Sequence, residues 1–317
     1  MDKFMNFNVA IIMSTYNGEK YLDEQIDSIL NQSFTNFTLY IRDDGSQDST
    51  VQIIDKYKKI DNRIIFDNKN NNLGPCRSFL ELTYQVDADY YIFSDQDDVW
   101  KKDKILHMLE SMATLDQRLP CLVHSELDIV DKDLRIINNS FYKFSGIQLD
   151  IAKNKKQILF QNYVVGCSSC INRKLWEIAK TEKKFWPNIA MHDWWFSIHA
   201  IFFGQIKFIP TSDISYRQHS SNVLGAKNNN LYRYIISGIT GSGFKRAKIF
   251  RQKVYQQVKL FSEKNIENLT TEDKKIINDF EMISDDSNLV SLVNFIYIKK
   301  YTLQSKKRNL AFCLSFL

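Results

Sequence analysis

Residues 8–30 read NVAIIMSTYNGEKYLDEQIDSIL and hold one strand, one polar loop and one helix. Residues 9–13 are all apolar, as expected of a strand buried on both faces of a parallel sheet. The polar stretch 14–18 interrupts this run, and apolar side chains then recur at helical spacing between residues 22 and 30. A buried strand, a polar turn and an amphipathic helix together form the repeating unit of an α/β fold.

The same unit recurs along the first hundred residues. Apolar runs predict three further strands, at 37–41, 63–66 and 90–93. The helices between them begin after capping or turn residues, namely Asp48 or Ser49 and Gly74-Pro75. This alternation predicts right-handed crossovers and a mostly parallel, doubly wound sheet. Neither GxGxxG nor GxxxxGK occurs after a strand, which argues against a dinucleotide fold and against a glycine-rich phosphate loop.

Polar clusters follow three of the predicted strands, where ligands of parallel sheets bind. The clusters are residues 14–17, Asp43-Asp44 and residues 95–98. In SDQDDVW (94–100) the carboxylates Asp95, Asp97 and Asp98 fall within four positions. Two like charges about 4 Å apart repel each other by roughly 1 kcal/mol in water and by about 4 kcal/mol at a protein surface. A bound cation is therefore expected to offset the repulsion among these carboxylates.

Mg²⁺ and Mn²⁺ suit this carboxylate cluster, because both prefer oxygen ligands and share their coordination sphere with phosphate oxygens. Each cluster also has a plainer interpretation. Asp98 could cap a helix that starts near Lys101, and Asp43-Asp44 could be ordinary turn residues before Gly45-Ser46.

Beyond residue 120 the sequence predicts mixed elements. Strands are expected at 121–124, 206–209 and 214–216, a hairpin at 127–137, and helices at 175–180 and 194–203. From about residue 231 the chain reads as helical and basic, with a packing stripe of Ala247, Phe250, Val254, Val258 and Phe261. We therefore expect a main domain over 1–225, with halves meeting near residue 115, and a helical C-terminal region over 226–317.

Two further motifs carry reactive side chains. In His192-Asp193-Trp194-Trp195 a carboxylate among aromatic rings suits a general base beside a sugar. It could equally be a helix cap with both tryptophans in the core. In YRQH (216–219) Arg217 and His219 could meet a phosphate.

Composition and charge limit the partners. The 317 residues are 44% hydrophobic and 25% charged, which is typical of a globular protein, and the net charge of +5 does not favour nucleic acid. Five cysteines, including the pair Cys167 and Cys170, read as reduced core residues. No apolar run is long enough to span a membrane, but residues 289–317 are basic and aromatic and could bind an anionic membrane surface.

The motifs together resemble a known family. They are VAIIMSTYNGEKYLDEQIDSILNQSF, IRDDGSQDST, NLGPCRSF, SDQDDVWKKDKI and MHDWW, in that order. The chain is similar over residues 8 to 220 to the family 2 inverting glycosyltransferases of GT-A fold. The forms DQDDVW and HDWW resemble its bacterial rhamnosyltransferase branch.

This resemblance implies a role for each matching residue. It implies that Ser14 and Tyr16 line the base and ribose, that Asp44 binds the pyrimidine, that Asp193 is the catalytic base, and that Mg²⁺ or Mn²⁺ binds Asp97. The remaining assignments are Arg77 and Asp95 to the nucleotide, His219 to the metal, and Asp98, Trp100, His192, Trp194 and Trp195 to the acceptor or sugar. A second carboxylate usually precedes the base, and His192 stands in its place.

The expected reaction is transfer of L-rhamnose from dTDP-L-rhamnose to a hydroxyl of a growing surface polysaccharide or lipid-linked glycan. It is expected in the cytoplasm, with peripheral contact to the inner face of the plasma membrane. A UDP-hexose or UDP-N-acetylhexosamine donor is the alternative within the same mechanism. A non-catalytic binding module is a further alternative, but it would be expected to have lost Asp97 or Asp193, and both are present. A nucleotidylyltransferase would need basic residues in the first loop to bind a triphosphate, and none occurs there before Lys20.

Overall fold

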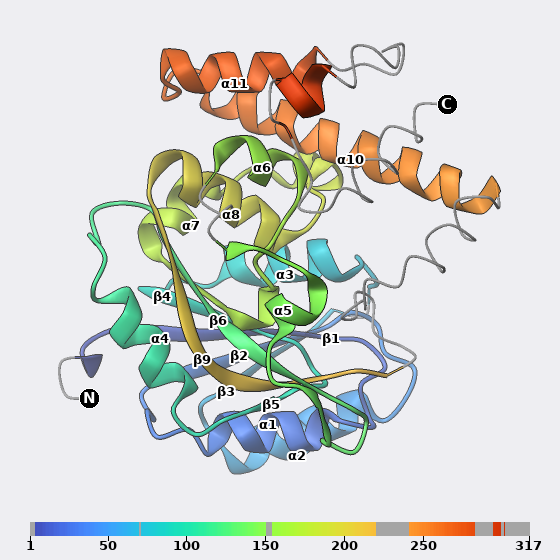
Figure 1. Ribbon diagram of the computed structural model, residues 1–317. Coiled ribbons are helices and arrows are strands. Elements are labelled where there is room, and N and C mark those ends of the chain that lie inside the picture. Colours follow the sequence, from blue (N-terminus) through green and yellow to red (C-terminus); the bar gives the residue numbers. More distant parts are fainter. Residues whose placement is uncertain are drawn as a thin grey trace. The chain divides into compact units, whose positions relative to one another are not determined.

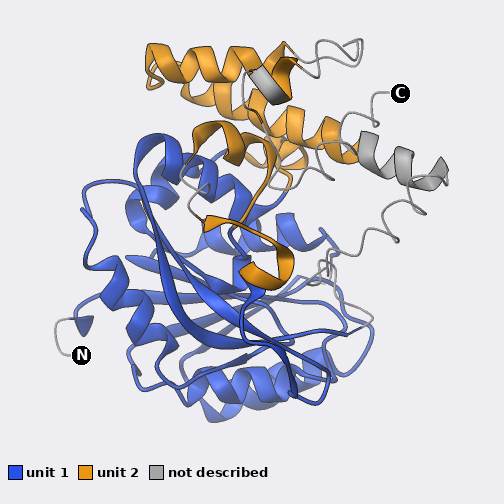
Figure 2. Cartoon of the chain, in the orientation of Figure 1, with its two compact units in different colours: residues 1–141, 164–181, 191–226 blue, residues 142–163, 182–190, 227–317 orange. Residues whose placement is uncertain are grey.

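The computed structural model describes residues 4–69, 71–149, 154–219, 241–282, 294–298 and 301, with the backbone alone at 241–248 and 297–298. The chain forms two compact units (Figure 2). Unit 1 comprises Met1–Phe141, Val164–Thr181 and Met191–Ala226, and unit 2 comprises Tyr142–Tyr163, Glu182–Ala190 and Lys227–Leu317. Two internal segments, Tyr142–Tyr163 and Glu182–Ala190, thus cluster with the C-terminal region in unit 2.

The first half of unit 1 alternates strands and helices as the sequence predicts. Its elements are β1 (Val9–Thr15), α1 (Leu22–Leu30), β2 (Thr38–Asp43), α2 (Thr50–Ile60), β3 (Ile64–Asn68), α3 (Pro75–Gln85) and β4 (Tyr90–Ser94). The four strands are parallel, in the order β3-β2-β1-β4. Helices α1 and α2 cover one face of this sheet and α3 covers the other, so the sheet is doubly wound (Figure 1).

The second half of unit 1 makes the sheet mixed. It adds β5 (Val99–Trp100), α4 (Lys104–Met112), β6 (Cys121–Val130), β7 (Ile136–Asn138), η3 (Gly166–Ser168), β8 (Ser169–Asn172), α7 (Arg173–Ala179), α8 (His192–Phe203) and β9 (Gln205–Arg217). The order continues β4-β8-β6-β9-β5, with β7 beside β6. Strand β8 is antiparallel to β4 and β6, and β5 is antiparallel to β9. The α/β class is confirmed, but the parallel arrangement holds continuously only from β3 to β4.

Strand β9 corrects the prediction of two separate late strands. Residues 205–217 form one strand that runs parallel to β6. Its register shifts where Ser125 pairs with Ile209 and Glu126 with Ser212, so a bulge accommodates Pro210 without ending the strand. The continuous strand carries its last residues to the same edge of the sheet as the ends of β1 and β6.

Unit 2 is helical. It contains α5 (Phe141–Ser145), which begins at the last residue of a unit 1 segment, α6 (Lys155–Phe160), η4 (Lys183–Asn188), α10 (Gly241–Asn265), α11 (Thr271–Glu281) and η5 (Asn294–Ile298). Val254, Val258 and Phe261 of α10 are buried as the helical stripe predicts, whereas Phe250 is 56% exposed and is not part of the core. The side chain of Ala247 lies outside the described residues.

Two side-chain contacts stabilise the helices of unit 2. Thr270 and Asp273 form a reciprocal cap at the start of α11, which satisfies amide groups that would otherwise have no partner. Lys155 binds Asp273 at 2.6 Å. Among the described residues, no helix combines the length and the apolar character needed to cross a bilayer. The basic cluster of Lys299, Lys300, Lys306, Lys307 and Arg308 lies outside the described residues.

Candidate active site

The three polar clusters meet at one edge of the sheet in unit 1. In the paired strands Ser14 lies opposite Arg42, Thr15 opposite Asp43, and Met13 opposite Ser94. The loops after β1, β2 and β4 therefore start side by side, as the parallel arrangement requires. Strand β9 ends at the same edge, because the main-chain N–H of Arg217 donates to Asp98 at 3.1 Å.

The two aspartates after β2 have different partners. Asp43 accepts hydrogen bonds from the Thr15 hydroxyl at 2.9 Å and from the main-chain N–H groups of Gly45 and Ser46, so it is the turn residue. Asp44 instead pairs with the buried guanidinium of Arg42 at 2.5 Å. The turn interpretation of this pair therefore fits Asp43, and the contact of Asp44 with a nucleotide stays a prediction.

Asp44 is buried in a polar network. Its carboxylate also accepts the main-chain N–H groups of Leu73 and Gly74, both at 2.8 Å. The Arg42 guanidinium donates to the Ser78 hydroxyl at 2.8 Å, and Ser78 in turn lies 2.6 Å from the Ser14 hydroxyl. Ser14 and Asp44, both expected at the nucleoside, are therefore joined through Arg42 and Ser78, two residues that the sequence motifs did not single out.

Two other expected nucleotide contacts lie on the surface. Tyr16 is 48% exposed and belongs to the loop after β1. Arg77 is exposed on α3, and its Nε donates to the carbonyl of Leu73 at 2.7 Å. Tyr16 follows β1 and Arg77 lies in the first turn of α3, and their contacts with a nucleotide stay predictions.

Asp97 and His219 form a close pair of potential metal ligands. Nε2 of His219 lies 2.8 Å from a carboxylate oxygen of Asp97, and both side chains are partly exposed. The His219 ring stacks on Tyr21, with the ring centroids 4.9 Å apart. One carboxylate oxygen and one imidazole nitrogen at this separation can both reach a single divalent cation, so the donor set fits Mg²⁺ or Mn²⁺.

Arg217 holds the loop that carries Asp97. Its Nε donates to the main-chain oxygen of Asp97 at 2.8 Å, and a second guanidinium nitrogen donates to the carbonyl of Lys132 at 2.6 Å. A third contact is an ion pair with Glu24 of α1. The sequence suggested that Arg217 could meet a phosphate, but the buried guanidinium is committed to the protein itself.

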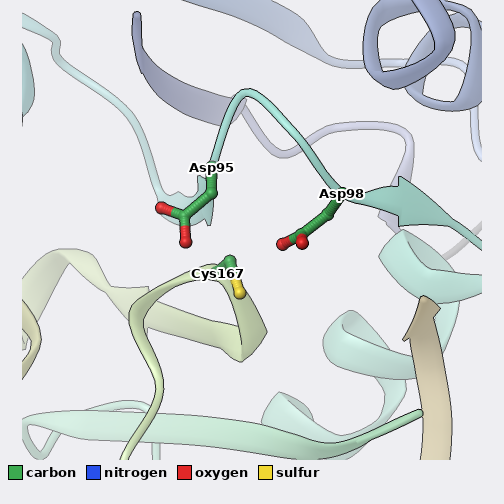
Figure 3. Close-up of side chains that lie close together, drawn as sticks. All are labelled: Asp95, Asp98 and Cys167. Atoms are coloured by element: carbon green, nitrogen blue, oxygen red, sulfur yellow. The ribbon is translucent and has the colours of Figure 1, made fainter. Parts of the chain in front are cut away.

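Asp95 and Asp98 converge on Cys167 of η3 (Figure 3). One ligand atom from each of the three residues lies within 4.8 Å of the others. Burial, followed by the charge of Asp97, raises the pKa of Asp95 to about 7 and the pKa of Asp98 well above its usual value. Both shifts reflect burial and the repulsion among the clustered carboxylates, which a bound cation would relieve.

Lys104, the first residue of α4, lies beside Cys167 of this cluster. Its ammonium group is fully buried, donates to the carbonyl of Cys167 at 2.7 Å and lies 3.3 Å from the centroid of the Trp100 ring. Burial lowers the pKa of Lys104 to about 7, against the opposing effect of Cys167 and the nearby carboxylates. The run KKDK (101–104) is charged throughout, so the sequence alone does not indicate that Lys104 is buried.

Asp193 lies at the second position of α8, whose N-cap is Met191. One of its carboxylate oxygens accepts the main-chain N–H of Trp194 at 2.6 Å, and the helix dipole at this end stabilises a negative charge. A Cβ atom on Gly166 would lie 3.5 Å from a carboxylate oxygen of Asp193, so the expected base lies beside η3, whose Cys167 meets Asp95 and Asp98. The side chain is 9% exposed.

His192 differs from Asp193 although the two are adjacent. Its imidazole is 2% exposed and stacks on Phe79 at 4.2 Å, and among the described residues neither ring nitrogen has a hydrogen-bond partner. Burial lowers the pKa of His192 to about 3. The ring is therefore neutral at ordinary pH and does not share the proton chemistry expected of Asp193.

The five residues expected at the acceptor or sugar are buried. Asp98, Trp100, His192, Trp194 and Trp195 are at most 4% exposed. The indole N–H of Trp195 donates to the carbonyl of Ala179 at 2.8 Å, and the Trp100 ring is covered by Lys104. Their contacts with an acceptor or a sugar stay predictions. Asp98 does not cap α4, since Asp103 stands at that N-cap.

The chain is similar to known glycosyltransferases. Residues 10–178 match the family described as Glycosyl transferase family 2. RfbG of Shigella flexneri, named as a dTDP-rhamnosyl transferase, is 32% identical over 232 residues, which make up 68% of this chain and 74% of RfbG.

Two solved structures share the fold. TarS 1–349 from S. aureus, in complex with UDP-GlcNAc, matches with a TM-score of 0.53 at 14% identity, over 98% of this chain and 89% of that chain. The mannosyltransferase PcManGT from Pyrobaculum calidifontis, in complex with GDP-Man and Mn²⁺, matches with a TM-score of 0.51 at 12% identity, over 98% and 84%. The family match over more than half of the chain, together with the likeness to RfbG, shows that the chain belongs to the family 2 glycosyltransferases and has their GT-A fold.

Proposed function

We propose that this glycosyltransferase transfers L-rhamnose from dTDP-L-rhamnose, with inversion, to a hydroxyl of a surface polysaccharide or lipid-linked glycan. The observation that carries the mechanism is the place of Asp193 at the N-terminus of α8, where a Cβ atom on Gly166 of η3 would lie 3.5 Å from its carboxylate oxygen. Cys167 of η3 in turn lies beside Asp95 and Asp98, in the loop that also holds Asp97. The rhamnosyl part of the proposal is supported by the likeness to RfbG.

The polar network around Asp44 is assigned to the nucleoside. A pyrimidine base presents an N–H group and carbonyl oxygens, and Asp44 and Ser14 offer an acceptor and a hydroxyl of matching kind. The ion pair with Arg42 keeps the Asp44 carboxylate in a single orientation. Tyr16 is exposed in the loop after β1. It is assigned to the ribose, which would extend from the base toward Asp97.

Asp97 and His219 are assigned to a bound Mg²⁺ or Mn²⁺. Such an ion would supply positive charge to the departing diphosphate. The chain's own contribution is to hold the two ligand side chains in place, through the Tyr21 ring beside His219 and through the Arg217 contact to the main chain of Asp97.

Asp193 is assigned as the general base. It takes the proton from the acceptor hydroxyl while the hydroxyl oxygen forms a bond to the anomeric carbon. The bond between that carbon and the terminal phosphate oxygen breaks, and its electron pair leaves with the nucleoside diphosphate. Attack on the face opposite the leaving group inverts the anomeric configuration.

A panel of nucleotide sugars tests the donor assignment. The enzyme would be incubated with Mn²⁺ and dTDP-L-rhamnose, UDP-glucose, UDP-galactose or UDP-N-acetylglucosamine, and release of the nucleoside diphosphate would be measured. We expect the highest rate with dTDP-L-rhamnose. Turnover of a UDP-sugar without turnover of dTDP-L-rhamnose would overturn the rhamnosyl assignment and leave the inverting mechanism in place.

A UDP-N-acetylhexosamine donor is the second candidate. It is supported by the likeness in fold to TarS, which was solved in complex with UDP-GlcNAc. Both donors carry a pyrimidine, so the polar network around Asp44 could bind the base of either donor. The choice of donor then depends on contacts to the sugar.

A further inference from the structure

We infer that Gln96 is a positioning residue that locks the nucleoside side of the site to its diphosphate side. Gln96 lies between Asp95 and Asp97, and its side chain reaches the loop after β1 that carries Ser14 and Tyr16. The inference rests on the proposed function in one respect, namely that these two loops bind the two halves of one nucleotide-sugar donor.

The contact has two points. The side-chain oxygen of Gln96 accepts the main-chain N–H of Tyr16 at 2.8 Å, and its amide nitrogen donates to the main-chain oxygen of Tyr16 at 3.0 Å. The two residues are 80 positions apart in the sequence. Of the side chains close to glutamine in size, only an amide both donates and accepts in this way, so the contact copies one rung of a β-ladder between two loops.

Gly18 is the second half of this contact. A Cβ atom at position 18 would lie 2.4 Å from the side-chain oxygen of Gln96 and 2.7 Å from its amide carbon, and its third-nearest neighbour is the Gln96 amide nitrogen. Gly18 is absent from the glycines with positive φ, so backbone strain does not require glycine here. The space taken by the Gln96 side chain accounts for the glycine.

The loop after β1 is also tied to the loop after β2. The main-chain N–H of Asn17 donates to the Ser46 hydroxyl at 2.8 Å, and the main-chain N–H of Gly18 donates to the Thr50 hydroxyl at 2.8 Å. Gln96 extends these contacts to the third loop. A donor that binds through both its base and its diphosphate gains most when the two subsites keep a fixed separation, because less order must be imposed on binding.

Nucleotide binding tests the role of Gln96. Affinities for dTDP with Mn²⁺ and for thymidine alone would be measured by calorimetry on the wild type and on Gln96→Ala. Loss of two hydrogen bonds corresponds to roughly tenfold weaker dTDP binding. Thymidine occupies one subsite only, so its affinity should change by less than about twofold.

A double-mutant cycle with Gly18→Ala gives the sharper result. The new methyl group should push the Gln96 amide away from Tyr16 and so reproduce the effect of Gln96→Ala. The double variant should then also bind dTDP about tenfold more weakly, instead of the roughly hundredfold expected of two independent losses. Gln47→Ala is the matched control, because its side-chain amide contacts the carbonyl of Gly45 and not Tyr16.

The outcomes separate this inference from the proposed function. If wild-type protein binds no nucleoside diphosphate, the proposed function fails. If the wild type binds dTDP and Gln96→Ala binds it equally well, or the cycle is additive, the positioning role of Gln96 is wrong. Equal weakening of thymidine and dTDP would also overturn it, because that pattern indicates a general loss of structure.

Discussion

Asp193 and His192 show how strongly a side chain's role depends on its immediate surroundings. Asp193 has a carboxylate at a helix N-terminus beside the loop of Asp97, whereas His192 points into an aromatic cluster of Phe79 and Phe93. The sequence places both residues in one motif. Of the two, Asp193 is the residue that we propose as the general base.

Replacement of Asp193 by Asn tests this assignment. The amide keeps the shape of the side chain but cannot take a proton, so we expect kcat to fall by roughly 10² to 10⁴-fold. Binding of dTDP with Mn²⁺ should stay within about twofold of wild type, because Asp193 acts on the acceptor. Near-normal turnover of the purified variant, checked by donor consumption with acceptor present, would remove Asp193 from the mechanism.

The buried histidines predict a loss of stability in acid. Burial lowers the pKa of His124 and of His192 to about 3, from 6.5 for a free side chain. As pH falls below about 6.5 the unfolded chain takes up protons at these residues and the folded chain does not. Each histidine therefore lowers the free energy of unfolding by up to about 1.4 kcal/mol per pH unit, down to about pH 3.

Urea unfolding of the wild type and of His124→Phe between pH 7 and pH 4 measures this effect. Phenylalanine keeps a ring beside Phe208 but cannot be protonated. The variant should show a smaller loss of stability with acid than the wild type, by about 1.4 kcal/mol for each pH unit below 6. Identical slopes for the two proteins would contradict the burial of a neutral imidazole at position 124.

At the scale of elements, the short antiparallel strand β8 brings a distant segment into the site. Ile92 pairs with Cys170 and Tyr90 with Asn172, so the start of β8 lies at the carboxyl end of β4. The preceding turn η3 thereby meets the loop after β4, and its Cys167 lies beside Asp95 (Figure 3). A strand of four residues has too little periodicity to be predicted from the sequence.

Helix α4 stabilises the same junction through Lys104. Removal of the ammonium group by Lys104→Met leaves the Cys167 carbonyl and the nearby carboxyl groups without their buried partner. We expect the free energy of unfolding at pH 7 to fall by roughly 1 to 2 kcal/mol, measured in urea, because the buried Cys167 carbonyl loses its hydrogen-bond donor. Lys102→Met is the matched control, because Lys102 is exposed, and it should change stability by less than about 0.5 kcal/mol. Equal effects of the two substitutions would show that Lys104 has no special role.

At the scale of the whole molecule, the chain combines a sheet-containing unit with a helical one. Every residue discussed for the active site belongs to unit 1. The helical unit includes the C-terminal region, whose basic residues 299–308 suggest an interaction with an anionic surface.

Truncation after residue 288 tests that interaction. The full chain should float with vesicles that contain anionic lipid and should dissociate at high salt, because screening weakens charge attraction. The truncated chain should stay with the unbound protein while it still binds dTDP with Mn²⁺, which serves as the control for folding of the site. Unchanged flotation after truncation would exclude residues 289–317 as the membrane contact.

Sequence reasoning predicted the parts of the fold that have local signals. The strands β1 to β4 and the helices between them follow from apolar runs and from capping or turn residues such as Gly74-Pro75. Strands β5 and β8 were missed, because they have two and four residues. The contacts of Arg42, Gln96 and Lys104 were missed as well, since each joins segments that are far apart in the chain.

Alternating elements and strand-end residues are local patterns. They were therefore enough to predict the α/β class, the edge of the sheet that carries the candidate site, and the family motifs with Asp44, Asp97 and Asp193. The position of Asp97 opposite His219, with its neighbour Asp98 buried, became clear only from the folded chain. The same holds for Gln96, which fills the space beside Gly18. The physical reason is that side-chain direction and burial depend on long-range packing, which neighbouring residues in the sequence do not share.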